Sequence, residues 1–172
     1  MIQKKRILLD QIPRLLRGYG QTHAGYGDDY QATVIVVCDL DDKCLKTFLG
    51  ELQAVLDTCD PRPKTRFCIA IEEGEAWFLG DIPTIKIAYP KAKDAVIDTY
   101  VNDAICGTWE ILADAVSTGG AQFLKARGRR AVGTEKSAWA ENIAPHMDVD
   151  QNASPSFCYF RERIGELTDP HQ

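Results

Sequence analysis

The sequence predicts an α/β fold with a mostly parallel central sheet flanked by helices, followed by a mainly helical C-terminal part. Two short apolar runs, residues 34–37 and 67–71, are too short for helices and contain strand-forming residues. Between them, residues 45–57 carry apolar side chains at helical spacing. Strand, helix, strand is a βαβ unit, and its crossover makes the two strands parallel.

Acidic side chains follow both predicted strands. In open α/β sheets, ligands bind beyond the carboxyl ends of the strands. Clustered carboxylates repel one another unless a cation or a proton relieves them, and Mg²⁺ (or Mn²⁺) prefers carboxylate oxygens. The sequence therefore predicts a metal-binding edge. Its candidate metal ligands are Asp39, Asp41 and Asp42, and its candidate catalytic residues are Glu72, Glu73 and Glu75.

The acidic residues have a simpler interpretation as well. Aspartate favours turns and the first position before a helix, so Asp41 or Asp42 could cap the helix that follows. Alternation along a strand also turns only some of the three glutamates to one side, and the sequence does not decide which.

The N-terminal segment predicts a helix and then a loop. Residues 4–17 are amphipathic, and Pro13 predicts either one kinked helix or two short ones. Residues 18–30 contain four glycines and three tyrosines, which is typical of a loop. His23 lies in this segment, and a lone loop histidine is more typical of a solvated side chain than of a catalytic acid or base.

The second half of the chain predicts mainly helices. A helix starting at residue 75 should end near Gly80, and Ser154 or Ser156 should cap the last helix. Residues 95–101 fit either a helix or an extended segment. The other predicted helices cover residues 83–88, 108–116, 135–143 and 157–167. We expect one domain over residues 1–172, with an α/β core over 1–105 and a helical extension over 106–172.

Composition excludes several classes of protein. The chain has 172 residues, 45% hydrophobic content and a net charge of −5, so it is not a basic nucleic-acid binder overall. It has no apolar run of the ~20 residues that span a bilayer and no signal-peptide pattern. Its six cysteines form no C-x-x-C pair or Cys/His cluster. We therefore expect reduced cysteines, no zinc site, no membrane partner and a cytoplasmic location.

Basic residues gather in one later segment of this acidic chain. Arginine and lysine hold phosphates by charge-assisted hydrogen bonds, although a solvated face is the simpler interpretation. The candidate phosphate- or nucleic-acid-binding residues are Lys91, Lys125, Arg127, Arg129, Arg130 and Lys136.

Known catalytic motifs are mostly missing. The sequence has no Walker A loop, no G-x-S-x-G and no H-E-x-x-H. The Asp39-Leu40-Asp41 segment is similar to the nucleophile motif of haloacid-dehalogenase-type phosphatases. That family has Thr or Val two residues after the second Asp, where this chain has Lys43, which disfavours a phosphatase.

A closer resemblance is to the Toprim (topoisomerase-primase) fold, and specifically to a bacterial Toprim-like family known as domain of unknown function four-two-seven-six. A Toprim domain carries D-x-D at the end of one parallel strand and a lone Glu at the end of an earlier one. The resemblance lies in PRLLRGYG (13–20), VVCDLDD (36–42), IAIEEGEAWFLGD (69–81), YPKAK (89–93), GTWEILADA (107–115), residues 136–139 and NASPSF (152–157).

This resemblance implies a Mg²⁺-dependent nuclease subunit that hydrolyses phosphodiester bonds of nucleic acid. Similar proteins are encoded beside an ATPase of the ABC/AAA type, in systems suspected of phage defence. Asp39 and Asp41 match the D-x-D, and the three glutamates match the acidic stretch before the family's Trp.

In one respect the chain departs from the family. Members usually begin with a strand that ends in Glu-Gly, whereas this sequence begins inside the helix that follows. Either the start of the domain is truncated, or the missing Glu comes from elsewhere in the chain, or the site is not catalytic. The last alternative favours a second hypothesis, a non-catalytic Toprim-like subunit that binds the ATPase. A sheet without that strand also exposes an edge, which favours a homo-oligomer.

Overall fold

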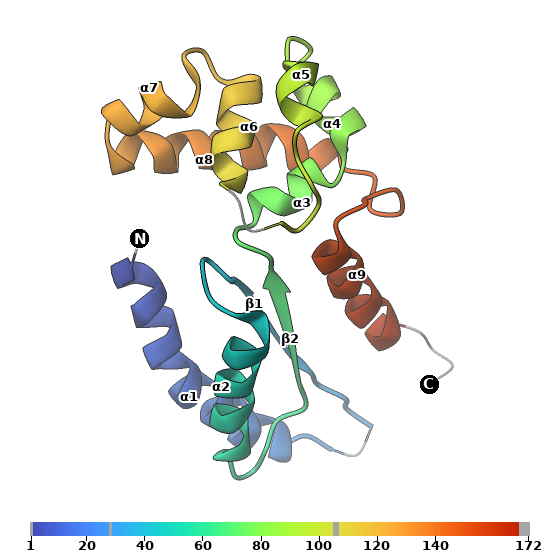
Figure 1. Cartoon of the computed structure of the whole chain (residues 1–172). Helices are drawn as coiled ribbons and strands as arrows, with labels where there is room; N and C mark the ends of the chain where they lie inside the picture. Colours follow the sequence, from blue (N-terminus) through green and yellow to red (C-terminus); the bar gives the residue numbers. More distant parts are fainter. Residues whose placement is uncertain (1, 28, 105–106, 169–172) are drawn as a thin grey trace. The chain divides into compact units, whose positions relative to one another are not determined.

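The computed structural model describes residues 2–27, 29–104 and 107–168 (Figure 1). The chain divides into two compact units. Unit 1 comprises Met1–Val37 and Lys43–Cys68, and unit 2 comprises Cys38–Asp42 and Ile69–Gln172. The boundary expected between residues 105 and 106 lies outside the described residues.

Two strands and one helix form the predicted βαβ unit. Strand β1 covers Val34–Asp39, helix α2 covers Leu45–Asp57 and strand β2 covers Thr65–Ala70. The helix has the bounds expected from its apolar spacing, and Phe48 and Leu52 are buried along it. In the part of the chain that the structure describes, the sheet has these two strands only.

The two strands are parallel. The Val34 N–H donates to the Lys64 carbonyl at 2.9 Å, and the Leu40 N–H donates to the Ala70 carbonyl at 2.9 Å. The pairing keeps the same offset at both ends, which only parallel strands do. The α/β class and the parallel arrangement are thus confirmed, in a sheet smaller than the central sheet that we expected.

Helix α1 covers Ile2–Ala24 without a break and contains Pro13. The prediction of a loop from residue 18 onward was therefore wrong for residues 18–24. A Cβ on Gly20 would lie 2.0 Å from the carbonyl oxygen of Pro61. This glycine serves the close approach of α1 to a neighbouring backbone, which sequence patterns do not distinguish from a loop signal.

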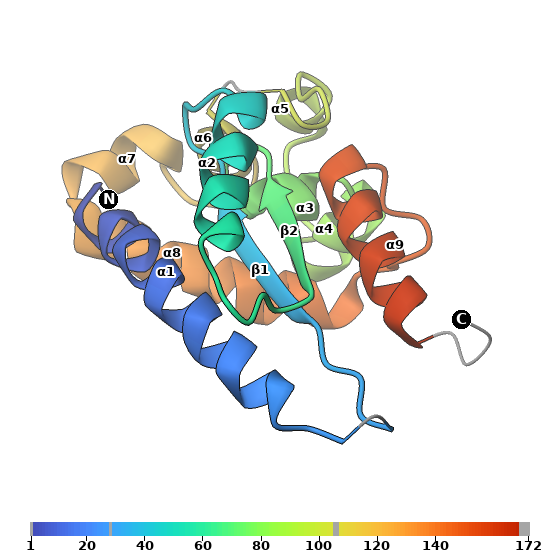
Figure 2. The ribbon, with the colours of Figure 1, turned by 90° about the horizontal axis from the view of Figure 1, so that it is seen from below.

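Helix α1 runs alongside β1 in unit 1 (Figure 2). Ile12 and Leu16 of α1 are buried. An open pocket of about 230 Å³ remains between the two elements, lined by Ile12, Leu15, Leu16, Tyr19 and residues 34–37.

Unit 2 is built from short helices around a buried core. Its elements are α3 (Glu75–Leu79), α4 (Ile82–Ala88), α5 (Asp94–Ile97), α6 (Thr108–Val116), α7 (Gly120–Ala126), α8 (Arg129–Ile143), a 3-10 turn (Ala144–His146) and α9 (Pro155–Thr168). Helices α4 and α7 both contact α8 (Figure 1). The core includes Ile85, Leu112, Trp139 and Ile143, all with no exposed surface.

The predicted helices of unit 2 differ from the observed ones mainly at glycines. Helix α6 has the expected bounds, but it ends before Gly119 and Gly120, which lead into α7 with φ angles of 82° and 64°. Helix α8 starts at Arg129, six residues earlier than expected, directly after Gly128 (φ 89°). Each glycine supplies a left-handed residue between two helices.

The NASPSF segment (152–157) fixes the start of α9. The Ser154 hydroxyl accepts from the Phe157 N–H at 3.3 Å, which makes Ser154 the predicted cap. The Trp77 Nε1–H donates to the Ser156 hydroxyl at 2.9 Å, and the Asn152 side chain donates to the Trp77 carbonyl at 2.7 Å. The segment therefore holds α9 against α3.

Two expectations from composition concern membrane-spanning helices and the state of the cysteines. Within the described ranges, every helix is too short or too polar to cross a membrane. Cys38, Cys44, Cys59, Cys68 and Cys158 form no disulfide with a described residue, and Cys106 lies outside the described residues.

Candidate functional site

The six candidate acidic residues belong to unit 2 and lie at or just beyond the carboxyl ends of β1 and β2. The Asp41 N–H donates to the Glu72 carbonyl at 2.8 Å, so one backbone hydrogen bond joins the two turns. Both residues adopt positive φ angles, 53° for Asp41 and 59° for Glu72. Residues other than glycine rarely adopt a positive φ, and those that do are common at functional sites.

Lys136 of α8 reaches the acidic residues that follow β2. Its Nζ lies 2.6 Å from Glu73 Oε2 and 3.0 Å from Glu75 Oε2. The lysine side chain is 20% exposed, and the two glutamates are 7% and 10% exposed. These three residues and Asp39 are called the acid–lysine cluster below.

Asp39 belongs to the cluster through its electrostatic environment. Its side chain accepts a hydrogen bond from the Gly74 N–H and remains exposed on one side. Partial removal of solvent, followed by the charges of Glu75 and Asp41, raises the pKa of Asp39, while Lys136 opposes this rise. Its carboxylate therefore lies within electrostatic reach of both Lys136 and Glu75.

The cluster contains more negative than positive charge. Burial, together with the charges of Glu75 and Asp39, raises the pKa of Glu73 to about 7, although the hydrogen bond from Lys136 lowers it. Burial alone would lower the pKa of Lys136, but the carboxylates of Glu75 and Glu73 outweigh it and raise that pKa. The ammonium of Lys136 thus offsets the charge of several carboxylates, and it stays protonated.

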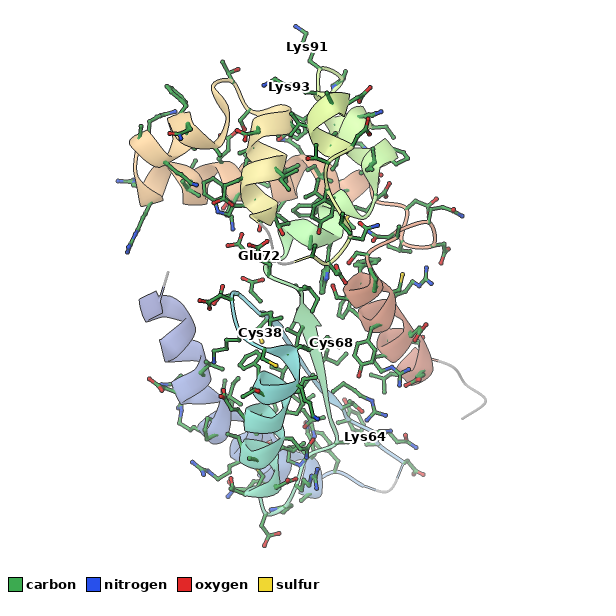
Figure 3. The ribbon with its side chains drawn as sticks, in the orientation of Figure 1. Cys38, Lys64, Cys68, Glu72, Lys91 and Lys93 are labelled. Carbon is green, nitrogen blue, oxygen red and sulfur yellow. The ribbon has the colours of Figure 1, made fainter. Side chains whose placement is uncertain are left out.

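Glu72 lies at the N-terminus of α6 and holds it there. Its carboxylate accepts from the Gly107 N–H at 2.8 Å and from the Thr108 N–H at 2.7 Å, and the Thr108 hydroxyl donates to it as well. A carboxylate at a helix N-terminus satisfies free N–H groups and favours the helix dipole. Figure 3 shows Glu72 at this end of α6. The structure thus gives this candidate catalytic residue a structural task.

Asp42 lies apart from the acid–lysine cluster. It is exposed in the turn after β1, and it makes no hydrogen bond or ion pair with another described residue. Of the three predicted metal ligands, Asp39 and Asp41 are therefore the pair linked to the cluster by charge.

The predicted phosphate-binding residues do not form one surface. Lys136 is inside the acid–lysine cluster, and Lys91 lies at the end of unit 2 opposite Glu72 (Figure 3). Lys125 Nζ lies 3.0 Å from Glu110 Oε1 and stacks over Trp109.

The three arginines of the basic segment are all exposed. Arg127 covers the ring of Phe123, with its guanidinium carbon 5.6 Å from the ring centroid. Arg129 and Arg130 occupy the first turn of α8 and form no ion pair with a described residue. These two arginines are thus the basic residues best placed to contact a phosphate.

The donor set of the site suits a hard divalent cation. Among the described residues, no group of three or more Asp, Glu, His or Cys side chains is placed to hold a metal ion together. Mg²⁺ needs no such group, because it usually binds one or two carboxylates and keeps several waters. Asp39 and Asp41 would be those carboxylates. The ammonium of Lys136 already places one positive charge within electrostatic reach of Asp39.

Sequence reasoning did not anticipate the position of Lys136, yet a signal was present. Trp139 and Ile143 lie three and seven residues further along α8, and both are fully buried. A lysine on the same helical face as two core residues must be buried in part, and a buried ammonium needs carboxylate partners.

Comparisons with known proteins give no match. No family model, no curated protein and no solved structure matches the chain. The Toprim-like resemblance therefore stays a prediction from sequence, and the functional argument depends on the geometry of the acid–lysine cluster.

Proposed function

We propose that this chain is a Toprim-like, divalent-metal-dependent nuclease subunit that hydrolyses phosphodiester bonds. The observation that carries the proposal is the acid–lysine cluster at the carboxyl ends of two parallel strands. Open α/β sheets place their ligands at this edge. Burial, followed by neighbouring carboxylates, raises the pKa of both Asp39 and Glu73, and carboxyl groups with raised pKa values are common in active sites.

In this proposal, Asp39 and Asp41 hold Mg²⁺ or Mn²⁺. The ion supplies Lewis-acid chemistry, because it polarises a phosphoryl oxygen and lowers the pKa of bound water. Lys136 keeps Glu73 and Glu75 in place beside it. Arg129 and Arg130 would orient the nucleic-acid backbone through charge-assisted hydrogen bonds.

We also propose where the protein acts and with which partners. The family resemblance favours a cytoplasmic complex with an ABC/AAA-type ATPase, acting in phage defence. The open edges of a two-stranded sheet are consistent with a homo-oligomer or with pairing to a partner.

A cleavage assay tests the proposal. Labelled single-stranded and double-stranded DNA and RNA are incubated with the protein, with the ATPase present and absent, in Mg²⁺, in Mn²⁺ and in a chelator. We expect cleavage that needs the metal. In Asp39→Asn it should fall by more than the ~10–100-fold typical of outer-shell changes. Asp10→Asn, on the exposed surface of α1, is the matched control and should cleave normally. Undiminished cleavage by folded Asp39→Asn would refute the assignment.

One observation favours a second function, that of a non-catalytic subunit which binds the ATPase. Glu72 is used to hold α6, and Glu73 and Glu75 are bound to Lys136, so these acids already stabilise unit 2. On this alternative, the wild type cleaves nothing in any metal, and Asp39→Asn binds the purified ATPase as tightly as the wild type does.

A further inference from the structure

We infer that Lys136 takes the place of a second metal ion, so that the site holds a single divalent cation. The inference rests on the proposed function and specifies it further. It assigns the site to one-metal phosphodiester chemistry, in which a fixed ammonium group supplies the second positive charge.

The position of Lys136 carries the inference. In two-metal sites, the second ion lies about 3.5–4 Å from the first and is held by further carboxylates. Here the carboxylates that could do this are Glu73 and Glu75, and the ammonium bridges them at 2.6 and 3.0 Å. The lysine comes from α8, far along the chain, so this bridge is formed by tertiary packing and not by local sequence.

Burial makes the bridge hard to displace. The glutamate side chains are 7% and 10% exposed, and that of Lys136 is 20% exposed. A second divalent ion on these glutamates would leave the ammonium partly buried and without a carboxylate. Removing one partner of a buried ion pair is strongly unfavourable. On this inference, Lys136 balances the two glutamates, whereas the sequence had suggested that it orients a phosphate of the substrate.

The charges of the cluster agree with one ion. Asp39, Asp41, Glu73 and Glu75 carry four negative charges when ionised, and Lys136 offsets one of them. A single divalent ion held by Asp39 and Asp41 leaves one net negative charge. A second ion would make the region positive and repel Lys136.

The test counts bound Mn²⁺ by electron paramagnetic resonance and equilibrium dialysis. We expect one ion per chain in the wild type and in Lys136→Arg, which keeps the charge. In Lys136→Met, which has a similar volume and no charge, we expect two ions with the spectral coupling of close neighbours. The variant Lys136→Met/Glu73→Gln/Glu75→Gln should return to one ion, because the second set of ligands is gone.

The outcomes separate the inference from the proposed function. Two ions in the wild type overturn the inference and leave the nuclease proposal in place, whereas none in the wild type overturns both. One ion in Lys136→Met also overturns the inference. If Lys136→Met does not fold in metal-free buffer, it is refolded in Mn²⁺: recovery with two ions supports the inference, and failure to recover contradicts it.

Discussion

Lys136 Nζ lies 2.6 Å from Glu73 Oε2, although the two residues are 63 positions apart in the chain. This contact joins α8 to the turn that follows β2. It also places one buried ammonium beside the acidic residues of the sheet edge. The electrostatics of the candidate site depend on this pair and on the neighbouring Lys136–Glu75 pair, because all three side chains are mostly buried.

The raised pKa of Glu73 predicts how stability depends on pH. A carboxyl whose pKa is higher in the folded state than its ordinary value binds its proton more tightly when folded. Its contribution to the free energy of unfolding is therefore complete below about 4.5 and is lost as the pH rises to about 7. Urea denaturation from pH 4.5 to 8 should show the wild type losing stability relative to Glu73→Gln as the pH rises.

The exposed Glu51→Gln serves as the control for that experiment and should follow the wild type. Parallel curves for the wild type and Glu73→Gln over this pH range would show that burial does not raise the pKa of Glu73.

The carboxylate of Glu72 should stabilise the start of α6. Glu72→Gln keeps the shape of the side chain but removes the charge that accepts from Gly107 and Thr108. We expect a loss of about 1–3 kcal/mol in the free energy of unfolding, the range for hydrogen bonds to charged groups. Chemical denaturation measures it, with Glu51→Gln as a surface control that should stay within about 0.5 kcal/mol. A neutral Glu72→Gln would remove the structural task assigned to this residue.

Two glycines of α1 should respond in opposite directions to the same substitution. In Gly20→Ala, the new Cβ would lie 2.0 Å from the Pro61 carbonyl oxygen, so the backbone must shift. We expect a loss of about 1–3 kcal/mol or more. In Gly18→Ala, nothing lies within 4 Å, and the better helix propensity of alanine should add about 0.5–1 kcal/mol. Thermal melts of both variants measure these changes in stability. Equal changes in the two variants would contradict the close packing of α1 at Gly20.

Arg129 and Arg130 should contribute to nucleic-acid binding. If each contacts a phosphate, Arg129→Gln/Arg130→Gln lowers the affinity and reduces the slope of log K against log[salt] by about 1.4–1.8. Fluorescence anisotropy over a salt series measures this slope. Lys125→Gln is the comparison, since Lys125 is already paired with Glu110 and should change the slope less. An unchanged slope in the arginine variant would exclude these two residues from the interface.

Local patterns predicted those parts of the fold that local physics determines. The apolar spacing of residues 45–57 and 108–116 gave the bounds of α2 and α6, because one face of each helix is buried. Gly20 misled the prediction, since its role depends on Pro61, which is about forty residues away in sequence. Turn and packing glycines look the same in sequence.

The site was predictable in part. Acids after two parallel strands indicated which edge to examine, and this depends only on the topology of a βαβ unit. Which contact each acidic side chain makes was not predictable. Glu72 holds α6 and Glu73 binds Lys136, and both contacts bridge distant segments of the chain.

If the carboxyl ends of β1 and β2 form a divalent-metal site, calorimetric titration with Mn²⁺ should detect saturable binding. The wild type is compared with Asp39→Asn/Asp41→Asn, and circular dichroism confirms that both are folded. We predict saturable binding by the wild type that is lost in the double variant. No binding by the folded wild type, or equal binding by the variant, would contradict the account.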